Sequence, residues 1–286
     1  MRMHNADEHC GIAQAAVVTG DWWNVLVLRE IARGRVRFDA LAAELGLSRK
    51  VLTERLGRLV ASGVLRRSLY QRRPVRYEYL LTDSGLALLP LLVAMQEWGD
   101  RWMLGDGTAT ATATEGGAEH ARVHALTGTR LPAALELPAG DGTDHPVVAP
   151  DATATVLFTY PGVDPDVSDV PVPGAPEPAL DHGLFHRTWP EFRHTGVAVN
   201  AITTQLPEEP AAFATAQGIP YPLLSDARYR LTTALRLPTF RAGGRLHLKR
   251  LVLVVDPERT VRHTLFPVDD LPRAVEDALR LAATAT

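Results

Sequence analysis

Residues 45–59 read LGLSRKVLTERLGRL, and this stretch decides how the first third of the chain folds. Gly46 is typical of the end of one helix, and Ser48 is typical of the N-cap of the next. Apolar residues after Ser48 recur at spacings of one, three and four, which predicts one buried helix face made of Val51, Leu52, Leu56, Leu59 and Val60. The stretch therefore predicts two helices joined by a tight turn.

Further helices and one hairpin are expected on either side of this turn. The apolar spacing predicts helices over residues 12–18, 22–31 and 38–45, with Asp21 as the cap of the second. Gly63 ends the helix after Ser48, and two runs that are typical of strands follow over 64–70 and 75–81, joined by Gln71, Arg72, Arg73 and Pro74. Thr82 then caps a long last helix, in which apolar residues recur every three or four positions: Leu88, Leu92, Met95, Trp98 and Trp102.

Positive charge is concentrated in the same part of the chain. Nine basic residues and one acid lie between Ser48 and Arg76, whereas the whole chain has a net charge of −3. Such local asymmetry indicates a polyanion as the partner, because a solvated surface helix normally mixes both signs. The helix face opposite the apolar one carries Arg49, Lys50, Thr53, Glu54, Gly57 and Arg58.

Helix, tight turn, helix and a two-stranded wing together form the winged helix-turn-helix order, an α+β fold. Arginine and lysine can donate to guanine edges or phosphates, and threonine can contact a thymine methyl group. Glu54 could accept from cytosine or only orient an arginine. The hairpin arginines are expected to hold phosphates or to enter the minor groove. The predicted DNA contacts are therefore Ser48, Arg49, Lys50, Thr53, Glu54, Arg58, Arg72, Arg73 and Arg76.

Several ordered motifs across residues 9–103 resemble HxlR-type regulators. They are C-x-I-x-x-A at 10–15, G-D-W-W-x-x-L-V-L-R-E at 20–30, R-F-D at 37–39, L-G-L-S-R-K-V-L-T-E-R-L-x-x-L at 45–59, G-V-L-x-R at 63–67 and Y-x-L-T at 79–82. The resemblance implies a homodimer on an inverted-repeat operator of double-stranded DNA, with the terminal helices as the dimer interface. The stripe with Trp98 and Trp102 suits that interface, although contact with the second domain is the alternative.

The chain has a single cysteine, Cys10. One thiol excludes a disulfide within the chain and fits a reducing cytoplasm. The resemblance implies a redox-sensing role for Cys10, since regulators of this type often sense oxidants through an N-terminal cysteine. Oxidation would lead to a disulfide with a second chain or with a small thiol. The alternative is that Cys10 is a small buried residue without a redox role.

Length and composition favour two domains in a cytoplasmic protein. The 286 residues contain no apolar run long enough to cross a membrane, and the N-terminus MRMHNADEHC lacks the apolar core of a secretory signal. Residues 105–118 read GDGTATATATEGGA, a small and polar stretch that predicts a flexible linker. The expected domains are therefore 1–104 and 119–286.

The second domain alternates strands and helices. Strands are expected over 155–160, 197–204 and 250–255, with helices near 185–194, 210–217, 226–235 and 270–283, which predicts an α/β sandwich. Motifs over about residues 125–283 resemble peroxiredoxins of the thioredoxin-like fold: A-T-V-L-F-T-Y-P-G at 154–162, I-P-Y-P-L-L-S-D at 219–226, A-L-R-L-P-T-F at 234–240, L-K-R-L-V-L-V-V-D at 248–256 and F-P-V at 266–268.

The catalytic residues of peroxiredoxins are missing from this resemblance. Pro178 stands where the peroxidatic cysteine belongs, at the N-terminus of the helix after the first core strand, and Ala175 takes the place of the hydroxyl residue. Gly183 stands where some members carry a resolving cysteine. Only Arg250 matches the arginine of the family. Because a thiolate is the nucleophile in these enzymes, we expect no enzymatic activity here.

A small-molecule effector remains an option for the emptied pocket, with Arg250, Pro178, Tyr160 and Trp189 as its contacts. Arg250 could equally keep a structural hydrogen bond. His182 and His186, with His194, could share a metal, but we favour solvent-exposed histidines and expect no metal or cofactor.

The sequence as a whole predicts a DNA-binding transcription regulator. It would respond to a redox signal at Cys10, to a small ligand in the catalytically inactive second domain, or to both. In the alternative, the second domain is a dimerisation or partner-recruiting scaffold without a ligand.

Overall fold

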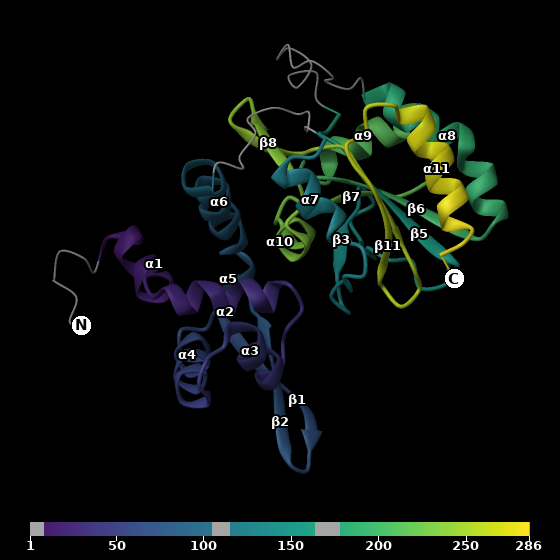
Figure 1. Cartoon of the computed structure of the whole chain (residues 1–286). Coiled ribbons are helices and arrows are strands. Elements are labelled where there is room, and N and C mark those ends of the chain that lie inside the picture. Colours follow the sequence, from purple (N-terminus) through teal and green to yellow (C-terminus); the bar gives the residue numbers. More distant parts are fainter. Residues whose placement is uncertain (1–8, 105–114, 164–177, 286) are drawn as a thin grey trace. The chain divides into compact units, whose positions relative to one another are not determined.

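The computed structural model describes residues 9–104, 115–163 and 178–285 (Figure 1). Its first part consists of helices and one hairpin. The chain divides between Ala94 and Met95 into a first unit (Met1–Ala94) and a second unit (Met95–Thr286). The first unit contains α1 (Gly11–Thr19), α2 (Trp22–Ala32), α3 (Phe38–Leu45), α4 (Arg49–Ala61), β1 (Leu65–Arg72), β2 (Val75–Leu81) and α5 (Asp83–Leu86). The division falls inside α6 (Leu89–Gly99). The predicted winged helix-turn-helix order is therefore confirmed.

The turn between α3 and α4 forms for the reasons that its sequence indicated. Gly46 adopts a left-handed conformation with φ 62°, which ends α3 at little steric cost. The Ser48 side chain accepts a hydrogen bond from the backbone N–H of Val51 at 3.3 Å and so caps α4. Leu52 and Leu56 of α4 are fully buried in the core of the first unit. That core fixes α4 by its apolar face and leaves its other face exposed.

Two expectations for the first unit were wrong in detail. The hairpin connection is shorter than predicted, because Gln71 and Arg72 continue β1 and pair with Arg76 and Val75. The long helix after Thr82 is interrupted between α5 and α6. Pro90 lies in the first turn of α6, where its ring is incompatible with a helical carbonyl four residues earlier, so one continuous helix is excluded.

The second unit contains a five-stranded mixed sheet in the order β11-β10-β5-β6-β7. Strands β5 (Ala154–Thr159), β6 (Val197–Thr203) and β7 (Leu223–Ser225) run parallel, and β10 (Leu251–Val255) pairs antiparallel with both β5 and β11 (Val261–Leu265). The central strands are continuous apolar runs because both faces of the sheet are covered. This arrangement confirms the α/β sandwich.

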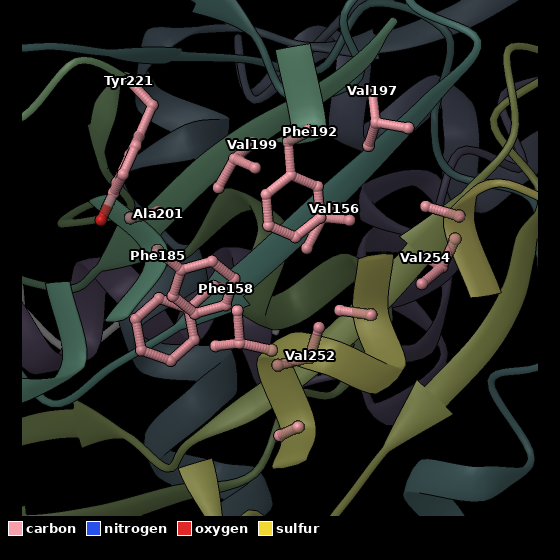
Figure 2. Close-up of a cluster of buried hydrophobic side chains, with 14 of the residues drawn as sticks. Val156, Phe158, Phe185, Phe192, Val197, Val199, Ala201, Tyr221, Val252 and Val254 are labelled. Carbon is pink, nitrogen blue, oxygen red and sulfur yellow. The ribbon is translucent and has the colours of Figure 1, made fainter. Parts of the chain in front are cut away.

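Helices cover both faces of this sheet (Figure 1). One face packs against α8 (Pro178–His194) and α11 (Leu271–Ala282), and the other packs against α7 (Ala118–His124) and α10 (Arg230–Leu235). Figure 2 shows the rings of Phe158, Phe185 and Phe192 among valines of β5, β6 and β10. Because this core holds β5 against α8, it also holds in place the region where the sequence predicted a ligand site.

The remaining elements lie outside the main sheet, and a π-helical turn, Asp100–Leu104, follows α6. Strands β3 (Glu136–Pro138) and β4 (Asp144–Pro146) form one small sheet, and β8 (Thr239–Ala242) and β9 (Arg245–Leu248) form another. Helix α9 (Glu208–Gln217) lies between β6 and β7 in the sequence. No helix in the described ranges is long and apolar enough to cross a membrane. The linker predicted at 105–118 lies mostly outside the described residues, so the domain limits 1–104 and 119–286 stay predictions.

Candidate functional sites

The outer face of α4 presents most of the predicted DNA contacts to solvent. Arg49, Lys50, Thr53, Glu54 and Arg58 are all exposed, and Ser48 is exposed at the cap. Their exposure follows from the burial of Leu52, Leu56 and Leu59 on the opposite face of the same helix. The structure thus brings these predicted residues together on one side of α4.

The exposed residues of α4 differ in whether their side chains are already paired with a neighbour. Arg58 donates to Glu54 at 2.6 Å, so in this structure Glu54 orients an arginine, which was one of its two expected roles. Arg49 pairs with Asp39 at 3.1 Å, and Thr53 donates to the carbonyl of Arg49 at 2.7 Å. Lys50 forms no ion pair within the described ranges, so its charge is the most available on α4.

The hairpin carries the other predicted contacts. Arg72, Arg73 and Arg76 are exposed around its tip, and none of them forms an ion pair with another described residue. Arg76 and Arg49 line one groove of about 280 Å³, which places the start of α4 next to the wing. The helix and the wing therefore each present one cation to the same groove.

Arg55 does not belong to this surface, although it was counted among the concentrated positive charges. Its side chain is half-buried and pairs with Asp21 at 2.6 Å. Asp21 also accepts from the backbone N–H of Trp23 at 3.0 Å, which confirms it as the cap of α2. The Arg55–Asp21 pair therefore links α4 to the start of α2 and supports the fold.

Cys10 is exposed and occupies the N-cap position of α1. Its side chain makes no capping hydrogen bond, and no residue of α1 is buried. The thiol is therefore accessible to a solution oxidant, but a redox role for it stays a prediction. Trp98 and Trp102 are also exposed, at 59% and 65% of their surface, and their predicted role in a dimer stays equally open.

The predicted ligand site lies where β5 and α8 meet. Pro178 is the first residue of α8, the helix that follows β5. Ala175 lies outside the described residues. Arg250 donates to both carboxylate oxygens of Asp181, at 3.0 and 2.5 Å, and Asp181 is fully buried. Arg250, which was predicted to bind a ligand, is therefore paired with Asp181. The sequence did not indicate this carboxylate.

The expectation of exposed histidines on α8 was wrong for His182, which is fully buried. His182, Phe185 and Phe192 recur at helical spacing on the face that packs on the sheet, whereas His186 and His194 point to solvent. Within the described ranges, no group of three metal-ligating side chains could hold an ion.

Aromatic rings surround His182. Tyr160 and His182 meet edge to face with ring centroids 4.5 Å apart, and Trp189 contacts Tyr221 at 5.8 Å. Tyr221 Oη donates to the carbonyl of His182 at 3.1 Å, so the Nδ1–H of His182 donates to Tyr221 Oη at 3.2 Å. Tyr160 Oη and His182 Nε2 have no hydrogen-bond partner among the described residues. The arrangement thus holds a neutral imidazole in a largely apolar shell.

Burial shifts the pKa values of this cluster in opposite directions. Burial lowers the pKa of His182 from its ordinary value of 6.5 to about 4. Burial also raises the pKa of Asp181 to about 6, although the neighbouring Arg250 acts against that rise. Burial raises the pKa of Tyr160 beyond its ordinary value, so this phenol stays protonated.

We expect His182→Phe to change how stability depends on pH. Below pH 6.5 the unfolded chain takes up a proton at His182 that the folded protein excludes, so the wild type loses stability as the pH falls towards 4. The raised pKa of Asp181 has the opposite effect on stability as the pH falls. Because Asp181 is present in both proteins, the difference between wild type and variant reports the contribution of His182 alone. The pKa of His182 is 6.5 in the unfolded chain and about 4 in the folded protein. Between pH 7 and pH 4.5 the wild type should therefore lose about 2–3 kcal/mol of unfolding free energy relative to His182→Phe.

Urea unfolding at the two pH values measures this gap. Trp189 labelled as 5-fluorotryptophan gives a ¹⁹F signal from the second unit alone, assigned with Trp189→Phe. The variant His186→Phe is the matched control, because His186 is exposed on the same helix. A gap for His182→Phe that does not change with pH would contradict a buried, neutral His182.

Comparisons with known proteins agree with these two units. The profile of the HxlR-like helix-turn-helix family matches residues 18–106, and that of the AhpC/TSA family matches residues 182–264. An uncharacterized HTH-type transcriptional regulator of Mycobacterium tuberculosis is 38% identical over 92 residues, which are 32% of this chain and 58% of that protein. YvaP of Bacillus subtilis, named in the same way, is 38% identical over 101 residues, 35% of this chain and 94% of YvaP.

The helices α3 and α4, the tight turn between them and the wing formed by β1 and β2 make this chain a winged helix-turn-helix protein. The chain belongs to the HxlR-like helix-turn-helix family, since it covers nearly all of YvaP. It spans little more than half the length of the mycobacterial relative.

The second unit is peroxiredoxin-like, as its motifs and the AhpC/TSA match show. The peroxidoxin BcpB from Mycobacterium tuberculosis is a similar solved structure, with 26% identity and a TM-score of 0.43 over 54% of this chain and 96% of BcpB.

Proposed function

We propose that this chain is a transcription regulator that binds double-stranded DNA through α4 and the wing. The observation that carries the proposal is the exposed cationic surface formed by α4 and the β1–β2 hairpin, in a chain of the HxlR-like family. Relatives named as HTH-type transcriptional regulators support it. The proposed contacts are Ser48, Arg49, Lys50, Thr53, Glu54, Arg58, Arg72, Arg73 and Arg76.

The proposed regulator acts as a homodimer on an inverted-repeat operator in the cytoplasm. Exposed apolar side chains at the ends of the helical region support self-association: Ile12, Val17, Trp22, Trp98 and Trp102. A symmetric dimer would place its two recognition helices about one helical turn of DNA apart. A footprint with two half-sites at that spacing is the expected result, and a single unrepeated site would contradict the dimer.

Fluorescence anisotropy with labelled duplexes tests DNA binding as a function of salt. If a dimer neutralises about six phosphates, the logarithm of its affinity should fall with a slope of about −5 in the logarithm of the salt concentration. The steepness arises because each neutralised phosphate releases condensed counterions. Failure to bind any duplex in dilute buffer would remove the proposed function altogether.

We also propose that Cys10 transmits a redox signal. The exposed thiol at the start of α1 supports the proposal, because an oxidant can reach it. Peroxide or a quinone should weaken operator binding of the wild type and leave Cys10→Ser unaffected. An equal response of both proteins would exclude Cys10 from the mechanism.

The second unit is proposed to be catalytically inactive. Cys10 is the only cysteine of the chain, and α8 begins with Pro178, which the resemblance to peroxiredoxins aligns with their reactive thiolate. Repeated consumption of peroxide in the presence of a thiol reductant, retained by Cys10→Ser, would contradict this assignment.

Two roles are open to the inactive second unit. In the first, a small effector binds beside Arg250, Pro178, Tyr160 and Trp189. In the second, the unit is a dimerisation or partner-recruiting scaffold, which the engagement of Arg250 by Asp181 favours. Thermal-shift screening of the full chain separates them, because an effector at this site should lose its stabilising effect in Arg250→Ala.

A further inference from the structure

A groove of about 280 Å³ lies between the starts of two helices and the hairpin of the first unit. Phe38 and Asp39 contribute from the start of α3, and Arg49 from the start of α4. The opposite side of the groove is formed by residues of the hairpin between Tyr70 and Tyr79. Two of the proposed DNA contacts, Arg49 and Arg76, therefore also line this groove.

Four of the nine described residues that line this groove carry an aromatic ring. Phe38, Tyr70, Tyr77 and Tyr79 all contribute, and Tyr70 and Tyr77 leave more than a third of their surface exposed. Guanidinium groups lie over both of these rings, that of Arg37 at 4.5 Å from the ring centre of Tyr70 and that of Arg67 at 5.9 Å from the ring centre of Tyr77. The ring surface that stays exposed favours a planar aromatic guest, since offset stacking adds to the burial of apolar area. A bare sugar–phosphate backbone would leave these rings without a complementary surface.

Charged groups stand at defined places among the rings. The Arg49 guanidinium lies 4.9 Å from the ring centre of Phe38 and is paired with Asp39. Arg76 also lines the groove and forms no ion pair with any described residue. An anionic guest would thus meet one uncommitted guanidinium, one partly committed guanidinium and one carboxylate that can accept a hydrogen bond.

We propose that this groove binds a small planar aromatic carboxylate of the hydroxybenzoate class. The ring would stack on the tyrosines, and the carboxylate would pair with Arg76, whose planar fork matches a carboxylate. A ring hydroxyl would donate to Asp39. The volume of about 280 Å³ suits a single-ring compound, because it lies just below the range of about 300–1,000 Å³ that is typical of small-molecule sites.

Occupancy of the groove has a consequence for regulation, and this step rests on the proposed function. Arg49 and Arg76 are among the proposed DNA contacts, so the aromatic acid and the duplex compete for the same guanidinium groups. The apparent Kd for DNA should rise in proportion to one plus the ratio of ligand concentration to ligand Kd. The acid would release the regulator from DNA without any signal through the second unit.

Isothermal titration calorimetry of the full chain with 4-hydroxybenzoate, in the absence of DNA, tests the site directly. We expect a submillimolar Kd, with much weaker binding of 4-hydroxybenzyl alcohol, which lacks the carboxylate, and of cyclohexanecarboxylate, which lacks the aromatic ring. Arg76→Gln should weaken binding by about tenfold or more, because a charge-assisted pair is lost. Tyr77→Leu should also weaken it, by removal of a stacking surface.

Arg66→Gln is the matched control, since Arg66 is an exposed arginine of β1 that does not line the groove. It should leave the affinity for 4-hydroxybenzoate unchanged. No detectable binding at millimolar ligand would overturn the proposal, and so would binding that Arg76→Gln and Tyr77→Leu both retain in full. Binding at the groove that leaves the affinity for DNA unchanged would overturn the competition.

A failure of the proposed function gives a different result. The wild type would then bind no duplex with or without ligand, while the calorimetric difference between Arg76→Gln and Arg66→Gln would persist.

Discussion

The double variant Lys50→Glu/Arg73→Glu should lose about 100-fold or more of its affinity for duplex DNA at moderate salt. Each substitution replaces an attraction to the duplex by a repulsion, and losing one base or phosphate contact typically costs about 1–3 kcal/mol. Both side chains are exposed and unpaired within the described ranges. The change should therefore act on binding and not on folding.

The two single alanine variants separate the roles of helix and wing. Arg73→Ala should weaken binding to all sequences alike and reduce the salt slope by about one for each contact removed. Lys50→Ala should instead change the sequence preference, because α4 is the element expected in the major groove. A panel of duplexes that differ at single positions, titrated at several salt concentrations, measures both effects.

Arg187→Glu is the matched control for the double variant, because Arg187 is an exposed arginine of α8 in the second unit. It lowers the net charge through a residue that is not among the proposed DNA contacts, by half as much as the double variant does. If Lys50→Glu/Arg73→Glu weakened binding no more than Arg187→Glu does, a general charge effect would replace the proposed interface.

Local signals were sufficient to predict the helix-turn-helix. Ser48 and Asp21 cap the helices that they were expected to cap, because a capping hydrogen bond depends only on residues two or three positions away. The interruption before α6 was also readable from Pro90, but the regular apolar spacing of the segment outweighed it. In the second unit, β7 has only three residues and β11 has three consecutive polar residues at its centre, so neither forms the apolar run used to find strands.

Long-range pairs explain what the sequence could not predict about the second unit. Asp181 and Arg250 are far apart in the chain, and nothing in their local sequence indicates that one engages the other. The burial of His182 also depends on packing against Tyr160 and Phe213. A helical-wheel comparison of His182 with Phe185 and Phe192 was the one signal that could have indicated it.

A second large effect is expected at Glu30 of α2, whose carboxylate is fully buried. It accepts from Arg29 at 2.7 Å, Arg33 at 3.1 Å and Arg35 at 2.9 Å. These arginines belong to the end of α2 and the segment that leads to α3. This carboxylate therefore bridges three like charges next to the helix-turn-helix, of which Arg35 also pairs with Glu44 at 3.1 Å.

Glu30→Ala should destabilise the first unit by about 3 kcal/mol. Removal of one partner from a buried ion pair typically costs about 3–5 kcal/mol, and the lower end applies because the three arginine side chains are 25–40% exposed and can be rehydrated. The loss should speed hydrogen exchange of the most protected amides in α2 and α4 by about 100-fold, if they exchange through unfolding of this unit.

Hydrogen-exchange mass spectrometry of the full chain measures this change and reports each unit through its own peptides. Glu54→Ala is the matched control, because Glu54 is an exposed acid whose pair with Arg58 within α4 should contribute only about 0.3–0.5 kcal/mol. Peptides of β5 and β6 should exchange at the wild-type rate in both variants, since they belong to the second unit. If Glu30→Ala accelerated exchange no more than Glu54→Ala, the three arginines would not depend on the buried carboxylate, and the core of α2 and α4 alone would account for the stability of the unit.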